Sequence, residues 1–418
     1  MPARLTEEIV KRADAVRFHT PSYAGIDLGL QKCDVTELPY TDNLLCPTSA
    51  LAELEKELAS AYKAEACFIS TQGATFNLFQ AVYACLPRGA FLLVGKLHAS
   101  VYNAMRHFGA TAYHVDALTE VTTIPGDVGT VILTSPDYFG RCAPLQKIYP
   151  YLHEKGIALL VDSAHGGHFV FSKELPVSAS EYSDLAVLSL HKTLPVMTGG
   201  SVLCVQNEYA LRADVLRKTM HSTSPSFAVL CSIEKAVADF TRNGEEYYAA
   251  VLKEVRDFKR ALKAPFVCDD ADDETRLTVR SPYDGESVYT RLLEKGFVAE
   301  MAYENGVTFI VNPYNYRHLP TLCAAFDGLT GKPYEKKAFP TASHPIPTRL
   351  SYGGEFEAIE VENAVGRRAY LEVGFYPPGV PCLYSHDVIT AEHAAMLKEP
   401  NAQKYVFGLE RGKILVVK

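Results

Sequence analysis

Two short segments contain residue types whose spacing predicts covalent chemistry with a carbonyl compound. Asp162 ends an apolar run in "VDSAHGGH" (161–168), and Lys192 follows another apolar run in "SLHKTL" (189–194). A lysine enclosed by apolar neighbours loses hydration, so its pKa falls and its amine becomes a nucleophile that forms Schiff bases. The simpler alternatives are a turn-capping role for Asp162 and a solvated surface position for Lys192.

A phosphate site is predicted around "TQGATFN" (71–77), which lies between a strand-like run and a predicted helix. Gly73 frees the backbone to turn, and the N–H groups of Ala74 and Thr75 would then lie at a helix N-terminus, where anions bind. The alternative is an ordinary strand-to-helix connection capped by Thr75. Ser189 and His191 add hydrogen-bonding groups beside the lysine.

His98 follows a further apolar run in "GKLHASV" (95–101) and adds a ring that could stack on a flat ligand. A phosphate cradle, a ring, a carboxylate and a nucleophilic lysine are the groups that hold pyridoxal 5'-phosphate. The carboxylate would keep the pyridine nitrogen protonated, so that the ring can accept electrons from a substrate carbanion. The sequence therefore predicts pyridoxal 5'-phosphate as the cofactor.

The elements that must position these groups alternate between apolar strands and amphipathic helices. Strands are predicted at 66–70, 91–94, 111–115, 130–135, 158–162, 185–190 and 201–205, and residues 206–262 read as mostly helical. Continuous apolar strands separated by helices indicate an α/β domain with a mainly parallel sheet, whose strand ends carry the ligand groups. A second strand pattern begins after "KAPFVCDDADDE" and indicates a smaller α+β domain.

We therefore expect an N-terminal arm at 1–44, a large cofactor-binding domain at 45–264 and a small C-terminal α+β domain at 265–418. The chain has 418 residues, 48% of them hydrophobic and 22% charged, with a net charge of -8. This charge argues against nucleic acid or an anionic membrane as the main partner. The ten cysteines form no C-x-x-C pair, and no metal site or membrane-spanning stretch is predicted. We expect a cytoplasmic protein with a small-molecule substrate.

The motifs resemble, in order, those of the Orn/Lys/Arg decarboxylases, which are fold-type I pyridoxal-phosphate enzymes with an aspartate aminotransferase-like large domain. "VDSAHGGHF" is similar to the family's V-D-E-A-H-G-A-H-F, and "SLHKTLPVMTGGSVL" to its S-x-H-K-T-L-x-x-x-T-Q-x-S-x-L. Similar matches cover most of the chain: "DVTELPYTDNL" (34–44), "QGATFN", "LHASV", "LTSPDYFG" (133–140), "STSPSF" (222–227), "ENAVGRRA" (362–369) and "YPPGVP" (376–381).

This resemblance implies a role for each matching residue. Lys192 would carry the covalent link to the cofactor, Asp162 would pair with the pyridinium nitrogen, and His98 would stack on the ring. The remaining cofactor contacts would come from Gly73, Ala74, Thr75, Ala164, His165, Ser189 and His191, with Ala164 on the other face of the ring. Thr223 would reach across the interface of a homodimer, or of a higher homo-oligomer, into the neighbouring active site. The implied reaction releases CO2 from arginine, lysine or ornithine and gives a polyamine-type amine.

The sequence departs from the family pattern mainly at positions that would bind the substrate. Asp387 stands where the family has a glutamate near the distal cation of the substrate; the alternative is an aspartate that caps the helix around "TAEHAAML". Asp137 replaces a threonine, and Glu300 matches a family acid. "FHTPSYAG" (18–25) lacks the family's His-Lys pair. The chain has no N-terminal wing domain, so we expect a short form that does not assemble into large rings.

Two other functions remain open at this stage. Another fold-type I reaction, such as that of an aminotransferase or a lyase, would use the same cofactor groups, and Arg349 would then bind the substrate α-carboxylate. A non-catalytic relative is the third possibility. The presence of both Lys192 and Asp162 argues against it.

Overall fold

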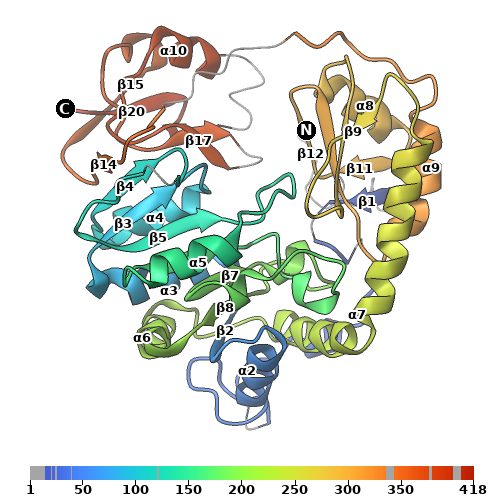
Figure 1. The fold of residues 1–418 in the computed structure, drawn as a ribbon, viewed down its shortest axis with the longest axis horizontal. Helices are drawn as coiled ribbons and strands as arrows, with labels where there is room; N and C mark the ends of the chain where they lie inside the picture. The colour runs from blue at the N-terminus through green and yellow to red at the C-terminus, as the bar shows by residue number, and fades with distance from the viewer. Residues whose placement is uncertain are drawn as a thin grey trace.

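The computed structural model describes residues 15–19, 21–23, 26–38, 40–119, 122–335, 343–375, 379–398 and 406–418 (Figure 1). Residues 1–14 of the predicted N-terminal arm, three residues of "FHTPSYAG" at 20 and 24–25, residue 39 of "DVTELPYTDNL" and the first three residues of "YPPGVP" lie outside the described residues. Among those described, no helix combines the length and the apolar character needed to cross a membrane.

An eight-stranded sheet forms the centre of the large domain, in the order β14-β4-β3-β5-β6-β7-β8-β2. The pairs β4–β3, β3–β5, β5–β6 and β6–β7 are parallel, whereas β8 is antiparallel to both of its neighbours and β14 is antiparallel to β4. The prediction of a mainly parallel α/β sheet is thus confirmed. The strands are β2 (Ala66–Ser70), β3 (Ala90–Val94), β4 (Ala112–Val115), β5 (Val128–Thr134), β6 (Ala158–Asp162), β7 (Leu185–Leu188), β8 (Ser201–Val205) and β14 (Thr348–Leu350).

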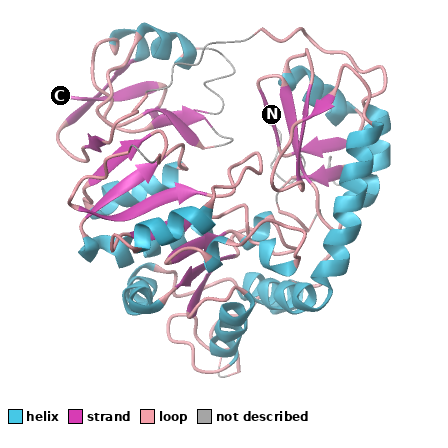
Figure 2. Ribbon diagram, viewed as in Figure 1, coloured by secondary structure: helices cyan, strands magenta, loops and turns pink. Residues whose placement is uncertain are grey.

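Helices cover both faces of this sheet, which explains why its strands are apolar throughout (Figure 2). Leu159 and Val161 of β6 face a core that also contains residues from three helices: α2 (Ala50–Ala61), α5 (Leu145–His153) and α7 (Phe227–Ala261). Leu160, between them, faces the opposite core, formed with α3 (Gly73–Cys85), α4 (Ala99–Phe108) and α6 (Ala210–Met220). The alternation follows from the two-residue period of a strand.

The carboxyl ends of the strands that run in one direction meet at a single edge of the sheet. β2, β3, β5, β6 and β7 all run this way, so their following segments, which begin at residues 71, 95, 135, 163 and 189, lie along one edge. The cofactor-binding segments predicted after β2, β3, β6 and β7 therefore lie along the same edge. One detail differs: the strand expected at 185–190 ends at Leu188, because residues 190–192 form a 3-10 turn.

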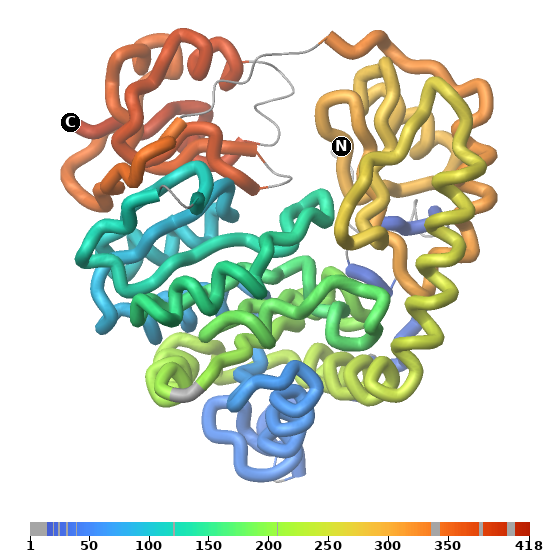
Figure 3. Tube along the Cα trace, in the orientation of Figure 1, coloured from blue at the N-terminus to red at the C-terminus, as the bar shows by residue number. Residues whose placement is uncertain are grey.

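The 35-residue helix α7 leads from the large sheet to a second sheet in the order β12-β13-β10-β9 (Figure 3). This unit contains β9 (Val267–Cys268), β10 (Arg276–Arg280), β11 (Phe297–Ala299), β12 (Met301–Tyr303) and β13 (Gly306–Ile310), with α8 (Gly285–Glu294) and α9 (Leu319–Ala325). The N-terminal strand β1 (Val16–Phe18) pairs in parallel with β11.

The C-terminal segment forms two three-stranded sheets and a short helix beside the β14 edge of the large sheet. Its elements are β15 (Phe356–Glu360), β16 (Val373–Phe375), β17 (Val380–Leu383), β18 (Val406–Phe407), β19 (Leu409–Glu410), β20 (Lys413–Val417) and α10 (Ala391–Leu397). Arg106 of α4 binds Glu372 at 2.9 Å and lies over the rings of Tyr352 and Tyr370. This contact ties the segment to the large sheet. The boundaries at residues 44 and 264 stay a prediction.

Candidate active site

Buried leucines and hydrogen bonds from Ser22 hold the turn that carries Lys192. Leu190 and Leu194 are fully buried and anchor the turn in the core, whereas Lys192 itself is only partly buried. Ser22 donates its hydroxyl to the Lys192 carbonyl oxygen at 2.6 Å, and its backbone N–H to the carbonyl of His191 at 3.0 Å. These contacts hold the backbone of the turn at Lys192.

The Lys192 amine lies among polar side chains, and burial lowers its pKa. Its Nζ is 3.2 Å from Nε2 of His165. Desolvation lowers the pKa of Lys192, and the Arg276 cation adds to this, while the negative charges of Asp162 and Glu300 oppose it. A neutral amine is the form that attacks a carbonyl carbon.

His165 connects Lys192 to two residues that the sequence reasoning did not single out. Nη2 of Arg276 lies 3.2 Å from Nδ1 of His165, and the ring of Tyr138 lies 4.8 Å from the His165 ring, centroid to centroid. Burial lowers the pKa of His165 well below its ordinary value, and the charges of Lys192 and Arg276 act in the same direction. The imidazole is therefore neutral.

Asp162 lies at the end of β6, where it is 3% exposed. Its Oδ1 accepts the backbone N–H of Ala164 at 3.2 Å. Burial raises the pKa of the Asp162 carboxyl, against the opposing charge of Lys192 and this hydrogen bond. A buried carboxylate with a single backbone donor is suited to a cationic N–H of a ligand.

His98 and the start of α3 are joined through Ser100. His98 is the N-cap of α4, and its Nδ1 accepts the backbone N–H of Ser100 at 3.2 Å. Oγ of Ser100 lies 3.3 Å from the Thr75 hydroxyl. Burial, followed by the charge of Lys192, lowers the pKa of His98 to about 4, so its ring is neutral at pH 7.

The predicted phosphate groups gather around the backbone of Gly199 and Gly200. Gly73, at the first position of α3 with a positive φ of 76°, donates its N–H to the Gly199 carbonyl at 2.8 Å. The His191 N–H binds the Gly200 carbonyl at 3.2 Å. The next backbone N–H groups, those of Ala74 and Thr75, stand in the first turn of a 13-residue helix whose N-cap side chain makes no capping bond. Such a terminus suits a phosphate.

His191 also contacts Ser189, the third predicted phosphate residue. Nδ1 of His191 lies 3.2 Å from the Ser189 hydroxyl and 3.1 Å from the Gly200 carbonyl oxygen. Burial lowers the pKa of His191 to about 4. The donor set, the amine and the buried carboxylate together fit pyridoxal 5'-phosphate.

Glu300 is the predicted substrate acid that the fold places beside this cluster. It lies between β11 and β12, and its Oε1 accepts the phenolic hydrogen of Tyr138 at 2.5 Å. Its charge influences both Lys192 and His191. Tyr138 follows the carboxyl end of β5 in "LTSPDYFG", so its position in a strand-end loop was the signal that could have identified it.

The carboxylates of the other two predicted substrate acids already have partners within the chain. Oδ1 of Asp137 accepts the backbone N–H groups of Phe139 at 2.8 Å and Arg141 at 3.0 Å, which closes a turn. Oδ2 of Asp387 accepts the Tyr384 N–H at 3.0 Å and lies 3.6 Å from Nε2 of His344. The alternative in which Asp387 caps α10 is wrong, because Thr390 forms that cap together with His393.

Thr223 and Arg349 are both exposed. The segment of Thr223 lies beside the phosphate turn of the same chain: Ser222 donates its N–H to Gln72 Oε1 at 3.2 Å. Arg349 pairs with Tyr113 on the outer strand β14 of the large sheet. This position, at the β4 end of the sheet, offers no observation in favour of Arg349 as the α-carboxylate ligand.

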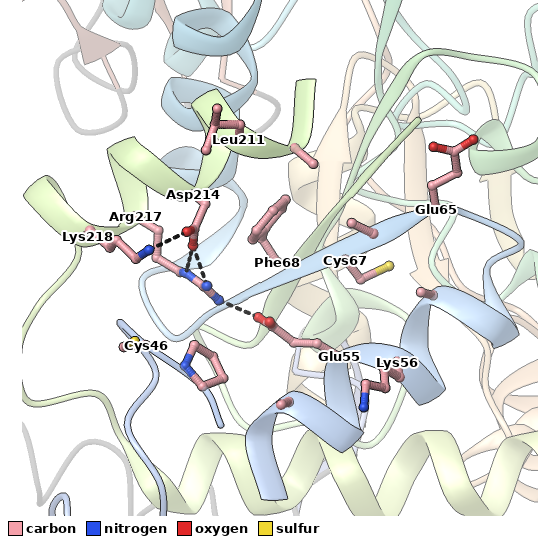
Figure 4. A pocket seen from close by; sticks show the side chains of 15 residues that line it. Cys46, Glu55, Lys56, Glu65, Cys67, Phe68, Leu211, Asp214, Arg217 and Lys218 are labelled. Carbon is pink, nitrogen blue, oxygen red and sulfur yellow. Dashed lines mark hydrogen bonds and ion pairs between the residues drawn. The ribbon is translucent and has the colours of Figure 1, made fainter. Parts of the chain in front are cut away.

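A cavity of about 460 Å³ lies elsewhere on the large sheet, between α2, the edge strand β2 and α6 (Figure 4). Arg217 in its wall is 3% exposed and binds Glu55 at 2.6 Å and Asp214 at 2.5 Å. None of the residues predicted to bind cofactor or substrate lines this cavity. The two sites are therefore separate.

Comparison with known proteins finds decarboxylases among those to which this chain is similar. The family described as "Orn/Lys/Arg decarboxylase, major domain" matches residues 112–283. An uncharacterized protein of Bacillus subtilis, YaaO, is 28% identical over 92% of this chain and 91% of its own length. An arginine decarboxylase of Halalkalibacterium halodurans is 24% identical, with 92% and 90% covered.

Solved structures share the fold. The lysine decarboxylase of Francisella novicida matches 99% of this chain and 80% of its own, with a TM-score of 0.70 and 15% identity. The serine palmitoyltransferase of Sphingomonas wittichii matches 75% and 86%, with a TM-score of 0.61 and 14% identity. The fold is that of fold-type I pyridoxal-phosphate enzymes. Within this class, residues 112–283 are similar to the major domain of the Orn/Lys/Arg decarboxylases.

Proposed function

We propose that this protein is a pyridoxal-phosphate-dependent decarboxylase of a basic amino acid, namely arginine, lysine or ornithine. The observation that carries the proposal is the Lys192 amine, whose pKa is lowered by burial, together with the buried Asp162 at the same carboxyl edge of the sheet. Its arginine decarboxylase relatives support the choice of reaction. The expected products are CO2 and a polyamine-type amine.

The residues of the chain would divide the work as follows. Lys192 would bind the cofactor covalently, Asp162 would hold a proton at its ring nitrogen, and His98 and Ala164 would cover the two faces of the ring. Ala74, Thr75, Ser189 and His191 would bind the phosphate. When bound, the cofactor supplies an electron sink for the bond between the substrate α-carbon and its carboxylate.

Glu300 is the acid that the geometry favours for the distal cation of the substrate. It lies between β11 and β12 on the second sheet, it is held by Tyr138, and its charge reaches Lys192. Asp387 remains an alternative, although its side chain is already paired with His344. A cytoplasmic homodimer in which Thr223 enters the neighbouring site belongs to the same proposal.

The test is release of CO2 from arginine, lysine and ornithine carrying labelled carbon in the α-carboxyl group, with cofactor added and no keto acid present. The proposal expects CO2 and the matching amine from at least one of the three. Turnover that requires a keto-acid acceptor and releases no CO2 would instead identify an aminotransferase and refute the proposal.

A further inference from the structure

Arg276 is a buried arginine that reaches from the second sheet into the site on the large sheet. It begins β10 and is 3% exposed. Its Nη2 lies 3.2 Å from Nδ1 of His165 and 3.5 Å from the His165 carbonyl oxygen. Burying a guanidinium cation costs free energy unless hydrogen bonds and nearby charges compensate for it.

The hydrogen-bonding chemistry of the three side chains determines which atom carries each hydrogen. Arginine has only donors, so Nδ1 of His165 must accept. In a neutral imidazole the hydrogen then lies on Nε2, which is the nitrogen 3.2 Å from Lys192. The Lys192 amine can accept this hydrogen only if it has a lone pair, because an ammonium group has donors alone.

We infer that Arg276 is a positioning residue that fixes the tautomer of His165 and thereby holds Lys192 as the neutral, nucleophilic amine. The inference deepens the proposed function, because it explains how the lysine is prepared for a carbonyl group. It assigns Arg276 no contact with substrate.

The surroundings of Arg276 hold it in this role. Gly140, with a φ of 83°, lies beside it, and a Cβ atom at Gly140 would stand 2.9 Å from the Arg276 Cβ atom and 2.8 Å from the Asp273 carbonyl oxygen. The Arg276 N–H also donates to the Asp273 carbonyl at 3.0 Å. The loop after β5 therefore leaves space for the arginine to pass to His165.

Several charged or titratable groups act on this pair from different elements, and a test must separate Arg276 from them. Asp162 of β6 and Glu300 of the second sheet raise the pKa of Lys192, whereas Arg276 lowers it. His98 and His191 act on His165. Removal of Arg276 alone should raise the pKa of Lys192 and so favour its protonated form. It should also allow the neutral His165 ring to carry its hydrogen on either nitrogen.

The experiment is competitive acetylation of the full-length chain, freed of cofactor, with trace acetic anhydride at pH 6 to 10. Mass spectrometry gives the reactivity of Lys192 relative to the exposed Lys147 in the same sample. In Arg276→Gln this ratio should fall about tenfold at pH 7, which is the size expected when one nearby like charge is removed. Arg276→Lys keeps a charge and a donor, so its ratio should stay within about threefold of wild type.

Arg280→Gln is the matched control, because Arg280 lies on the same strand and binds Asp269 at 2.7 Å. It should leave the ratio unchanged. An unchanged ratio in a folded Arg276→Gln protein would overturn the inference. If that variant does not fold, His165→Phe keeps a ring but removes the hydrogen bond, and an unchanged ratio there would overturn it equally.

Borohydride reduction of the wild-type protein with pyridoxal 5'-phosphate separates this result from the proposed function. A cofactor adduct on Lys192 together with an unchanged acetylation ratio would reject only the role of Arg276. A shifted ratio without any adduct would support the role of Arg276 and reject the cofactor assignment.

Discussion

Two groups of buried charged side chains lie on the same eight-stranded sheet and differ in how completely they are paired. At the β2 edge, Arg217 binds Glu55 at 2.6 Å and Asp214 at 2.5 Å, and its guanidinium lies 5.1 Å from the centre of the Phe68 ring. At the carboxyl ends of the strands, the Nζ of Lys192 has a neutral imidazole 3.2 Å away. The first group fixes a cation in place, whereas in the second group burial lowers the pKa of the Lys192 amine.

The difference follows from the partners. Carboxylates within hydrogen-bonding distance stabilise a buried cation such as the Arg217 guanidinium. At Lys192, desolvation and the Arg276 cation lower the pKa of the amine, against the opposing charges of Asp162 and Glu300. The ion network around Arg217 and the proposed catalytic group around Lys192 therefore differ in their partners, and variants at the two sites should affect different measurements.

The largest effect is expected for Lys192→Ala. It should reduce CO2 release by at least about a thousandfold, because the covalent step is lost. The melting temperature of the cofactor-free protein should change little, since Lys192 is partly exposed. Assays with labelled substrate measure CO2 release, and thermal unfolding measures the melting temperature. A variant that retains more than a tenth of the wild-type activity would show that the lysine is not the nucleophile.

Arg217→Met should give the opposite pattern. It leaves Glu55 and Asp214 without their buried cation and should lower the free energy of unfolding by about 3–5 kcal/mol, measured in urea. Activity per folded molecule should be retained. Lys218→Met, which removes the exposed partner of Asp214, is the control and should have little effect on stability. Equal losses in the two variants would contradict the structural role of Arg217.

The free energy of unfolding should also depend on pH through Glu55 at the β2 edge of the sheet. Burial raises the pKa of Glu55 from 4.5 to about 7, in spite of Arg217. The folded chain thus binds this proton more tightly than the unfolded chain, so stability falls as pH rises through this window and is constant above it. Relative to Glu55→Gln, the wild-type free energy of unfolding should fall by about 3 kcal/mol between pH 4.5 and 7.5. Parallel pH curves for the two proteins would contradict this pKa.

The smallest effect is expected for Glu300→Gln, which tests substrate recognition. Loss of one charge-assisted contact should raise KM for the basic substrate about tenfold, with a smaller change in kcat. Asp387→Asn is the comparison and should change KM less, because Asp387 already binds His344. A larger effect at Asp387 would move the distal-cation site to the C-terminal segment.

The sequence was sufficient to predict the sheet and to predict which residues follow the carboxyl ends of its strands. Asp162 and Lys192 were identifiable because each follows an apolar run, and parallel strands bring such positions to one edge. Arg276 and Tyr138 were not singled out. Arg276 is 111 positions from His165 and lies in an ordinary strand pattern, "RLTVRS", so only the packing of the second sheet against the first reveals the contact.

The substrate acids show the same limit. Asp387 matched a position of the family pattern. However, its carboxylate accepts the Tyr384 N–H and lies near Nε2 of His344, a residue 43 positions away in the chain. Glu300 depends on Tyr138, 162 positions away, for its orientation. Pairings between distant segments decide which acid is available, and no local pattern encodes them.

The most direct test of the account is borohydride reduction of the protein with pyridoxal 5'-phosphate, followed by peptide mapping by mass spectrometry. We expect a single major adduct on Lys192, lost in Lys192→Ala and retained in Arg217→Met. A protein that forms no adduct, or forms its main adduct on an exposed lysine such as Lys147, would contradict the assignment of Lys192 as the cofactor-binding residue.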